Sequence, residues 1–197
     1  MTASAPERAK VDVVALIASA GGLDALSGVL GDLPIDFPAP IIVQQHLGRQ
    51  TSILPTILAR RSHHEVAWAL DGEVLTPGRV AVCPARMQLH ITPGGICSLS
   101  PLAPTAFRTH DALLTSLADS YGARALAVVL SGSGTDGAAG TTALKNAGGT
   151  VIAQSEDTSE YASMPRAARV AGADLVLPLH EIGSAINRAV HGRPWRS

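Results

Sequence analysis

Three polar residues follow strongly apolar runs of this chain, and their types suit acyl-transfer chemistry. Ser19 comes directly after the run VDVVALIA, His46 comes after IIVQQ, and Asp136 lies shortly past ALAVVL. A serine hydroxyl can attack a carbonyl when a histidine takes its proton and a carboxylate orients that histidine. We therefore interpret Ser19 as a candidate nucleophile, His46 as its general base and Asp136 as the residue that orients the histidine.

The segments that must position these residues alternate between strand-like and helix-like patterns. Buried strands are predicted at 11–18, 40–45, 125–130, 150–153 and 175–177, and helices at 23–30, 52–61, 111–121, 138–147, 165–171 and 181–191. This alternation predicts a parallel sheet covered by helices on both faces. Because ligands bind beyond the carboxyl ends of parallel strands, we expect the three candidate residues to meet at that edge.

Between residues 65 and 102 the pattern changes to short apolar runs separated by Asp71-Gly72, Pro77-Gly78 and Pro93-Gly94-Gly95. Such turns are typical of hairpins. The predicted fold class is α/β, a doubly wound, mostly parallel sheet with helices on both faces and an antiparallel hairpin insertion at one sheet edge. We expect one catalytic domain over 11–191, with a flexible N-terminus at 1–10 and a C-terminal tail at 192–197.

Each candidate residue also has a structural interpretation. Ser19 could cap the helix that starts near Leu23, and Asp136 could cap the helix that starts at Ala138, because both types are favoured caps. His46 could serve packing at the end of its strand. The conjunction favours the catalytic interpretation, since independent caps have no reason to bring these three types to one edge.

A serine at a helix start lies beside unpaired backbone N–H groups and the positive end of the helix dipole. The N–H groups of Ala20, Gly21 or Gly22 could therefore hold an oxyanion that develops during attack on a carbonyl. Glycine at this place also leaves room for an incoming ester.

The loop around Asp136 supports a second hypothesis, a nucleotide- or dinucleotide-binding protein. Gly132, Gly134 and Gly137 match G-x-G-x-x-G between a strand and a helix, and Asp157 follows near the end of the next strand. We rank this hypothesis second because Asp136 would place a carboxylate beside a pyrophosphate. Two unit charges 4 Å apart repel by about 4 kcal/mol near a protein surface.

The composition restricts the other classes of function. Hydrophobic residues make up 46%, charged residues 16% and aromatic residues 3%, which predicts a compact domain with an aliphatic core. The net charge of -1 and the absence of Lys/Arg clusters argue against a nucleic-acid partner. The first ten residues lack the apolar core of a signal peptide, and no run reaches membrane-spanning length. We expect a cytoplasmic protein that does not insert into a membrane.

Metal and disulfide chemistry have no recognisable motif. Cys83 and Cys97 are the only two cysteines, and we expect both to be reduced. No H-E-x-x-H or paired-cysteine spacing occurs, so we expect no metal and no cofactor. We interpret as solvated surface residues the histidines outside the candidate set, among them His63, His64, His90, His110 and His191.

Four motifs occur in one order along the chain. They are Ile17-Ala18-Ser19-Ala20-Gly21-Gly22-Leu23, then Val43-Gln44-Gln45-His46, then Leu130 to Gly140 (LSGSGTDGAAG), and then Ala153-Gln154 with Met164-Pro165-Arg166-Ala167-Ala168. Over roughly residues 11–190 they resemble the catalytic domain of the chemotaxis methylesterase family CheB. Each motif alone is weak, but four in register are specific.

The resemblance implies a parallel α/β fold and hydrolysis of glutamyl methyl esters on chemoreceptor helices, often with deamidation of glutamines. The family's serine, histidine and aspartate match Ser19, His46 and Asp136. The implied partner is a methylated chemoreceptor or a similar helical protein. Activity should rise as His46 loses its proton. The resemblance assigns Arg166 no firm role.

Three departures from the family pattern affect what can be transferred. Ile17 stands where the family usually has glycine, which we expect to reshape the entrance to the site. Ser133 stands where methionine or another large residue is common, which we expect to widen the site. Only about ten residues precede the first strand, so we expect no receiver domain within this chain and regulation, if any, by a separate receiver protein.

Overall fold

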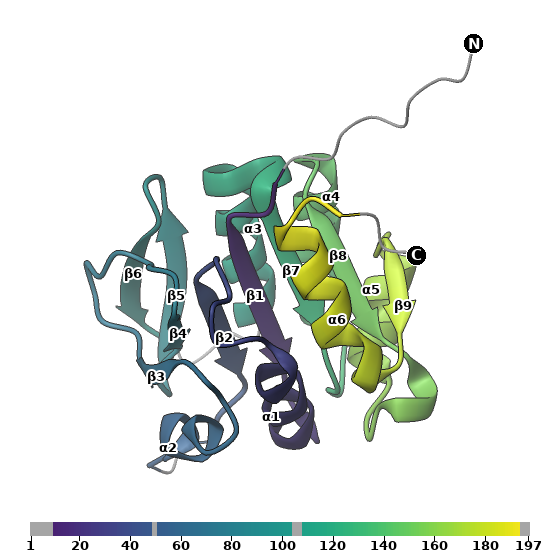
Figure 1. Ribbon diagram of the computed structural model, residues 1–197, viewed down its shortest axis with the longest axis horizontal. Coiled ribbons are helices and arrows are strands. Elements are labelled where there is room, and N and C mark those ends of the chain that lie inside the picture. Colours follow the sequence, from purple (N-terminus) through teal and green to yellow (C-terminus); the bar gives the residue numbers. More distant parts are fainter. Residues whose placement is uncertain (1–9, 49–50, 104–107, 194–197) are drawn as a thin grey trace.

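A computed structural model describes residues 10–48, 51–103 and 108–193. Its centre is a sheet of seven strands in the order β3-β4-β2-β1-β7-β8-β9 (Figure 1). All six neighbouring pairs are parallel. The strands are β1 (Val13–Ala18), β2 (Ile41–Gln45), β3 (Glu65–Trp68), β4 (Arg79–Val82), β7 (Ala125–Val129), β8 (Thr150–Gln154) and β9 (Leu175–Leu177).

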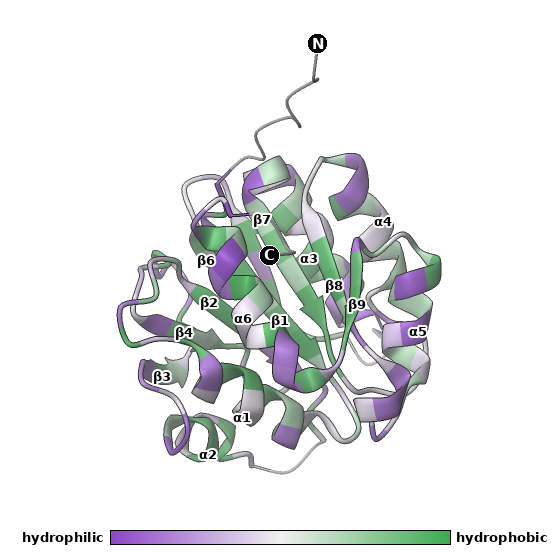
Figure 2. Ribbon diagram, turned by 45° about the vertical axis from the view of Figure 1, so that its right-hand side comes forward, coloured by the Kyte–Doolittle hydropathy of each residue, from purple (hydrophilic) through white to green (hydrophobic). Residues whose placement is uncertain are grey.

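Helices cover both faces of this sheet, as the sequence predicts. In Figure 1, α1 and α6 lie in front of the sheet, and α3, α4 and α5 lie behind it. Figure 2 shows that the strands between these layers are mostly hydrophobic. The helices are α1 (Gly22–Asp32), α2 (Leu54–Ala59), α3 (Thr109–Tyr121), α4 (Ala138–Asn146), α5 (Ser163–Val170) and α6 (Leu179–Val190).

The central strand β1 shows why these residues form a strand buried on both sides. All six of its residues are buried, and alternate side chains enter the two cores. Leu16 packs into the core beneath α1 and α6, whereas Ile17 packs into the core beneath α3 and α4. A strand between two helical layers needs apolar side chains at every position, which explains the unbroken run in the sequence.

The prediction of antiparallel pairing over 65–102 is wrong for its first half. β3 and β4 pair with each other in parallel and extend the main sheet. The Asp71-Gly72 and Pro77-Gly78 turns reverse the chain twice, so β4 re-enters the sheet in the direction of β3. Between them, Val74 forms only an isolated antiparallel bridge with Ile96.

The second half of the segment is the predicted hairpin. β5 (Met87–Thr92) and β6 (Ile96–Pro101) form a separate two-stranded antiparallel sheet, joined by the Pro93-Gly94-Gly95 turn. The Ile91 N–H donates to Ser116 Oγ of α3 at 2.9 Å, and Ser120 Oγ donates to the Ile91 carbonyl at 2.7 Å. The hairpin therefore braces α3. The predicted fold class, a mostly parallel sheet with an antiparallel insertion, is confirmed.

Helix α1 continues past Gly31, where the sequence pattern predicts its end. It runs to Asp32 because Leu33, rather than Gly31, adopts the extended conformation that precedes Pro34. The predicted flexible terminus at 1–10 and tail at 192–197 lie outside the described residues, apart from residues 10, 192 and 193. Among the described helices, none has both the length and the apolar character needed to cross a membrane.

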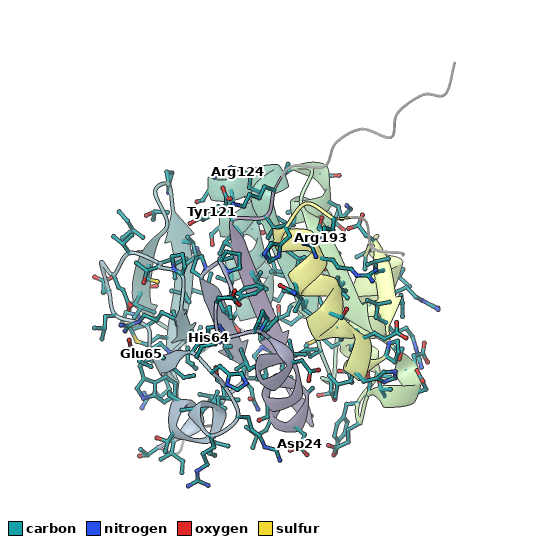
Figure 3. The ribbon with its side chains drawn as sticks, in the orientation of Figure 1. Asp24, His64, Glu65, Tyr121, Arg124 and Arg193 are labelled. Carbon is teal, nitrogen blue, oxygen red and sulfur yellow. The ribbon has the colours of Figure 1, made fainter. Side chains whose placement is uncertain are left out.

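The amino end of β1 is tied down by charge. Arg124 donates to Asp12 Oδ2 at 2.6 Å and lies 5.3 Å from the ring centroid of Tyr121, and Figure 3 shows Tyr121 and Arg124 together at this end of the molecule. The polar residues described below lie at the opposite end of the strand.

Both cysteines lie buried as free thiols. Burial raises the pKa of Cys83 to about 12 and, with the negative charge of Glu73, the pKa of Cys97 to about 11. Both thiols are therefore protonated at neutral pH and are poor nucleophiles.

We expect Gly140→Ala to lower the free energy of unfolding by about 1–3 kcal/mol, measured by urea denaturation. A β-carbon at Gly140 would lie 2.7 Å from Leu114 Cβ and 3.0 Å from the backbone of Asp111, where α3 and α4 meet. Gly28→Ala in α1 is the matched control, because its β-carbon would meet only the Leu179 side chain at 3.7 Å. The control should stabilise the protein by about 0.5–1 kcal/mol. Equal effects of the two substitutions would contradict the close packing of α3 on α4.

Candidate active site

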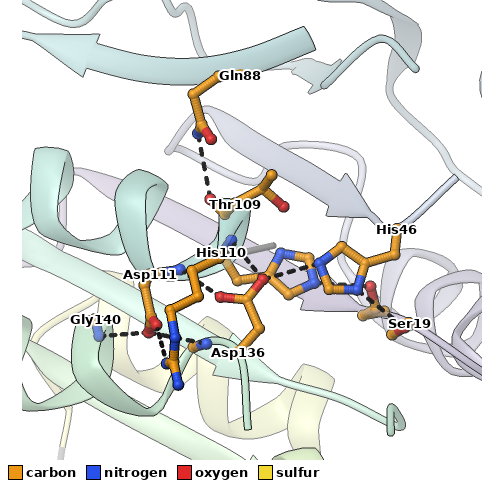
Figure 4. Close-up of polar contacts among 11 residues, drawn as sticks. Ser19, His46, Gln88, Thr109, His110, Asp111, Asp136 and Gly140 are labelled. Atoms are coloured by element: carbon orange, nitrogen blue, oxygen red, sulfur yellow. Dashed lines mark hydrogen bonds and ion pairs between the residues drawn. The ribbon is translucent and has the colours of Figure 1, made fainter. Parts of the chain in front are cut away.

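Ser19, His46 and Asp136 form a continuous chain of hydrogen bonds (Figure 4). His46 Nδ1 lies 3.1 Å from Ser19 Oγ, and His46 Nε2 lies 2.9 Å from Asp136 Oδ2. The His46 side chain is 34% exposed, whereas that of Asp136 is 7% exposed. The structure thus brings together all three residues that the sequence singles out, with the carboxylate buried and the histidine accessible.

The parallel register of β1 and β2 places the serine and the histidine side by side. Ala18 pairs with Gln45, and the next residue on each strand is Ser19 or His46. The His46 N–H donates to the Ala18 carbonyl at 3.2 Å, which continues the ladder one step beyond the strands. On the other side of β1, the Ser19 N–H donates to the carbonyl of Ser131, just past β7, at 3.0 Å. These contacts fix the backbone of the serine from both neighbours.

The site lies at the switch point of the sheet. The chain leaves β1 through α1 on one face and leaves β7 through α4 on the other face (Figure 1). The two helices diverge between these adjacent strands, and the carboxyl ends of strands at such a point are where open parallel sheets usually bind ligands. Ser19 follows β1, and Asp136 follows β7.

The hydrogen bonds define the tautomer of His46. An ionised carboxylate only accepts hydrogen bonds, so Nε2 must carry the proton that is donated to Asp136. Nδ1 then presents its lone pair to the Ser19 hydroxyl. The two ring nitrogens have the opposite partners in chymotrypsin-type proteases, but the chemical consequence is the same: an unprotonated nitrogen faces the serine.

Asp136 does not cap α4, the helix that follows it, so the alternative interpretation of this residue as a helix cap for α4 is wrong. Gly137, with φ of 97°, is the N-cap of α4. The Asp136 carboxylate instead lies at the start of α3, where it accepts the N–H of His110 on Oδ2 and the N–H of Asp111 on Oδ1, each at 3.0 Å. Burial by itself would raise the pKa of Asp136, but the hydrogen bond from His46 and those from the α3 backbone outweigh it and lower the pKa.

Asp111, in the first turn of α3, in turn caps the start of α4. Its Oδ1 accepts the N–H groups of Gly137 at 2.9 Å and Gly140 at 2.8 Å, and its Oδ2 pairs with Arg108 at 2.7 Å. The starts of α3 and α4 are therefore capped reciprocally, each by an aspartate from the other segment. The sequence pattern places Asp111 at a helix start but contains no signal for this partner.

His110 was also missed, and its interpretation as a solvated surface residue is wrong. Its side chain is fully buried, and its ring stacks on His46 with 4.0 Å between centroids and 14° between planes. His110 Nε2 lies 3.1 Å from the Ala18 carbonyl, to which it donates. His64 is likewise buried, against Phe37. The only sequence signal for a role of His110 was its position next to Asp111, where a helix was predicted to start.

The glycine loop does not support the nucleotide-binding hypothesis. A phosphate cradle needs free backbone N–H groups, but the three glycine N–H groups already have acceptors within the protein. These are the Tyr161 carbonyl for Gly132 at 2.9 Å, Ser163 Oγ for Gly134 at 3.0 Å and Asp111 Oδ1 for Gly137 at 2.9 Å. Gly132 serves packing instead, since a β-carbon at this position would lie 3.0 Å from Ser19 Cβ, whereas Gly134 has φ of 89° and no atom within 4 Å of such a carbon.

His46, His110 and Asp136 each offer a ligand atom within 4.8 Å of the others, which raises the question of a metal site. The lone pairs of an imidazole lie in the plane of its ring. Because the two rings are stacked and nearly parallel, a metal in the plane of one ring lies away from the lone pairs of the other. The arrangement suits a stacked pair of neutral rings and does not suit shared metal coordination.

The turn after Ser19 differs in two respects from the sequence-based expectations, in which Ser19 could cap α1 and the N–H groups of Ala20, Gly21 or Gly22 could hold an oxyanion. Gly21, with φ of 68°, is the N-cap of α1, and Ser19 makes no capping bond. The Gly22 N–H is already donated to the Ser19 carbonyl at 3.0 Å, which removes it from the candidate oxyanion donors. Within the described part of the chain, the N–H groups of Ala20 and Gly21 have no acceptor.

The positions that depart from the family pattern have distinct environments. Ile17 is fully buried, and a β-carbon at Gly137 would lie 2.8 Å from its Cδ1, so Ile17 fills the core under the loop and does not line the entrance. Ser133 is exposed on the loop before Asp136. Arg166 forms an exposed pair with Glu156 at 2.6 Å.

We expect Asp111→Ala to lower the free energy of unfolding by about 2–4 kcal/mol, because two N–H groups at the start of α4 lose their acceptor. Asp119→Ala, at an exposed position of the same helix, is the control and should change stability by less than about 0.5 kcal/mol. Urea denaturation of both variants measures the difference. A loss no larger than that of the control would exclude the reciprocal cap.

We also expect stability to fall as the pH is lowered from 6.5. Burial, followed by the charge of His46, lowers the pKa of His110 from its ordinary 6.5 to about 3, so in this range the unfolded chain binds a proton that the folded protein does not. Below 3.8 the lowered pKa of Asp136 acts in the same direction. Urea denaturation across this range should give a shallower pH dependence for His110→Phe than for the unsubstituted protein. Parallel curves would contradict a neutral buried His110.

Comparison with known proteins places these residues in a family. A family model described as CheB methylesterase matches residues 14–186. A protein-glutamate methylesterase/protein-glutamine glutaminase of Anaeromyxobacter dehalogenans is 44% identical over 188 residues, which cover 93% of this chain and 55% of that protein. A protein of the same description from Moorella thermoacetica is 42% identical over 193 residues, covering 94% of this chain and 46% of that protein.

The chain thus spans about half the length of these curated relatives. The crystal structure of the Thermotoga maritima CheB methylesterase catalytic domain superposes with a TM-score of 0.83 at 32% identity, covering 91% of this chain and 99% of that domain. The family model spans most of the chain, and the fold agrees with that of a family member. The chain belongs to the CheB methylesterase family.

Proposed function

We propose that this chain is a serine esterase that removes methyl esters from glutamyl side chains of a protein substrate and releases methanol. The observation that carries the proposal is the hydrogen-bonded chain from Ser19 through His46 to the buried Asp136. The family and the names of the relatives support the substrate class. We assign the nucleophile to Ser19, the general base to His46 and the orienting carboxylate to Asp136, within one catalytic domain over 11–191.

The first half of the reaction forms an acyl-enzyme. Ser19 Oγ attacks the ester carbonyl while its proton passes to His46 Nδ1, the nitrogen that faces it. The imidazolium that results is stabilised by Asp136 through Nε2. His46 then protonates the departing methoxide, which leaves as methanol, and the glutamyl group remains as an ester of Ser19.

The second half consumes water. His46 takes a proton from a water molecule that attacks the acyl carbonyl, and it returns this proton to Ser19 Oγ as the carbon–oxygen bond to the serine breaks. The products are the free glutamate side chain and the regenerated hydroxyl. A glutamine side chain can enter the same sequence with ammonia as leaving group, which would account for a glutaminase activity such as the one in the relatives' names.

The N–H groups of Ala20 and Gly21 are the donors that we assign to the oxyanion. They follow the nucleophile directly, lie at the positive end of α1 and have no acceptor among the described residues. Ser131 Oγ holds this turn in place by donating to the Ala20 carbonyl at 2.9 Å. Pre-positioned donors of this kind stabilise the tetrahedral intermediate without reorganisation.

A glutamyl methyl ester on the surface of a helix suits this open site, in which His46 remains one-third exposed. A pocket of about 250 Å³ beside His46, lined among others by Gln44, Arg86 and Thr109, gives room for substrate residues that flank the ester. We propose a methylated chemoreceptor or a similar helical protein as substrate, and action in the cytoplasm.

We expect Ser19→Ala to reduce methanol release from a methylated helical receptor fragment by about 10⁴-fold or more, since the nucleophile is removed. Ser27→Ala in α1 should leave the rate unchanged. A fluorescent fluorophosphonate should label the unsubstituted protein and the Ser27 variant but not the Ser19 variant. Full activity of Ser19→Ala would refute the assignment of the nucleophile.

The same assay separates the alternatives. Labelling of Ser19 without methanol release would show a serine hydrolase with another substrate, and the proposed substrate class would be wrong. A thermal shift with NAD or ATP in the absence of labelling would favour nucleotide binding over hydrolysis.

A further inference from the structure

His110 lies outside the hydrogen-bonded chain of Ser19, His46 and Asp136, but it contacts two of these residues, Asp136 and His46, and also Ala18, the neighbour of Ser19. The backbone N–H of His110 donates to Asp136 Oδ2 at 3.0 Å. Its ring stacks on that of His46, and its Nε2 donates to the carbonyl of Ala18, the residue before Ser19, at 3.1 Å. Figure 4 shows the His110 ring beside the His46 ring, between the start of α3 and the end of β1.

The stacking contact restricts the orientation of the His46 ring. The hydrogen bonds of a ring to two partners fix its two in-plane directions, but they resist a tilt out of the plane only weakly. The flat face of His110, 4.0 Å away and inclined by 14°, blocks that tilt from one side. His110 itself cannot yield, because its side chain is fully buried and held at both the backbone and Nε2.

The hydrogen bonds of His110 show that its ring is neutral. Nε2 donates to a carbonyl, so the remaining nitrogen, Nδ1, carries a lone pair in the neutral form, and this buried atom has no hydrogen-bond partner. A proton on Nδ1 would have no acceptor. Burial and the charge of His46 lower the pKa of His110 to about 3, against the opposing effect of Asp136.

The surrounding charges do not change this conclusion. The carboxylate of Asp111 is directed to Gly137, Gly140 and Arg108, and the Asp136 carboxylate receives hydrogen bonds from His46 and from the α3 backbone. Neutrality is useful here, since a cation stacked on His46 would oppose the imidazolium that forms each time Ser19 is deprotonated.

We propose that His110 is a positioning residue, whose neutral ring holds the plane of the His46 imidazole so that Nδ1 faces Ser19 while Nε2 faces Asp136. This role rests on the proposed function of the site. The effect of His110 on the orientation and tautomer of His46 does not depend on the substrate and can be tested separately.

Two substitutions separate the ring from its hydrogen bond. His110→Phe keeps a flat ring against His46 but loses the donor to Ala18, whereas His110→Gln keeps an N–H donor but loses the flat ring. Both keep the backbone N–H that binds Asp136. We expect kcat for 4-nitrophenyl acetate to fall by about 10²-fold in His110→Gln, with KM within about twofold, because misplacement of a catalytic group by about 1 Å costs this much. His110→Phe should retain kcat within about tenfold.

Leu117→Ala, at a fully buried position of α3 away from the site, controls for a general loss of stability. It should lower Tm while kcat of the folded protein stays unchanged. An unchanged kcat in His110→Gln, or an equal loss in the Phe and Gln variants, would overturn the role of the ring.

Nitrogen NMR of the His46 ring tests the proposal without any turnover. The unsubstituted protein and His110→Phe should show the Nε2–H tautomer, and His110→Gln should show a mixture of tautomers. The same single tautomer in all three proteins would overturn the proposal. If methanol release fails but the tautomers follow this order, the proposed substrate is wrong and the positioning role stands.

Discussion

The buried carboxylate of Asp136 at the start of α3 is the interaction on which the rest of the site depends. A carboxylate taken out of water without partners costs several kcal/mol, and here three N–H donors compensate for that cost. Two of them are backbone groups of α3 and the third is His46. The carboxylate that is bonded to His46 therefore also caps the start of α3, and its position is set by the backbone of that helix.

Asp111 caps the start of α4 as Asp136 caps the start of α3, so hydrogen bonds hold the two helix starts together. Close approach is possible because Gly140 has no side chain at the α3–α4 contact. The β5–β6 hairpin supports the same unit from outside, where Gln88 Nε2 donates to the Thr109 carbonyl at 3.3 Å (Figure 4). An insertion that contributes no residue to the hydrogen-bonded chain thus stabilises the helix that holds its carboxylate.

The parts of the site that sequence patterns predict are those fixed by local structure. Ser19 and His46 each follow a buried strand by one residue, so the prediction of parallel strands was enough to bring them together. His110 and Asp111 gain their roles from partners far along the chain, Ala18 in one direction and Asp136 in the other. Hydrophobic periodicity contains no information about such pairs. The turn motifs between β3 and β4 likewise show that the chain reverses there. They do not show that it reverses twice, which is why β3 and β4 are parallel and not antiparallel as predicted.

The bond between Ser131 Oγ and the Ala20 carbonyl joins segments 111 positions apart in the chain. During synthesis Ser19 is made before the strand and loop that complete its surroundings, because Ser131 follows Ala20 by 111 positions. Contacts of such long range form slowly, because closing a long loop costs conformational entropy before the contact compensates for it. Ser19 therefore gains its hydrogen-bonded partner chain only after β7 and the Asp136 loop have joined the sheet, and the hydrolysis that we propose requires the completed fold.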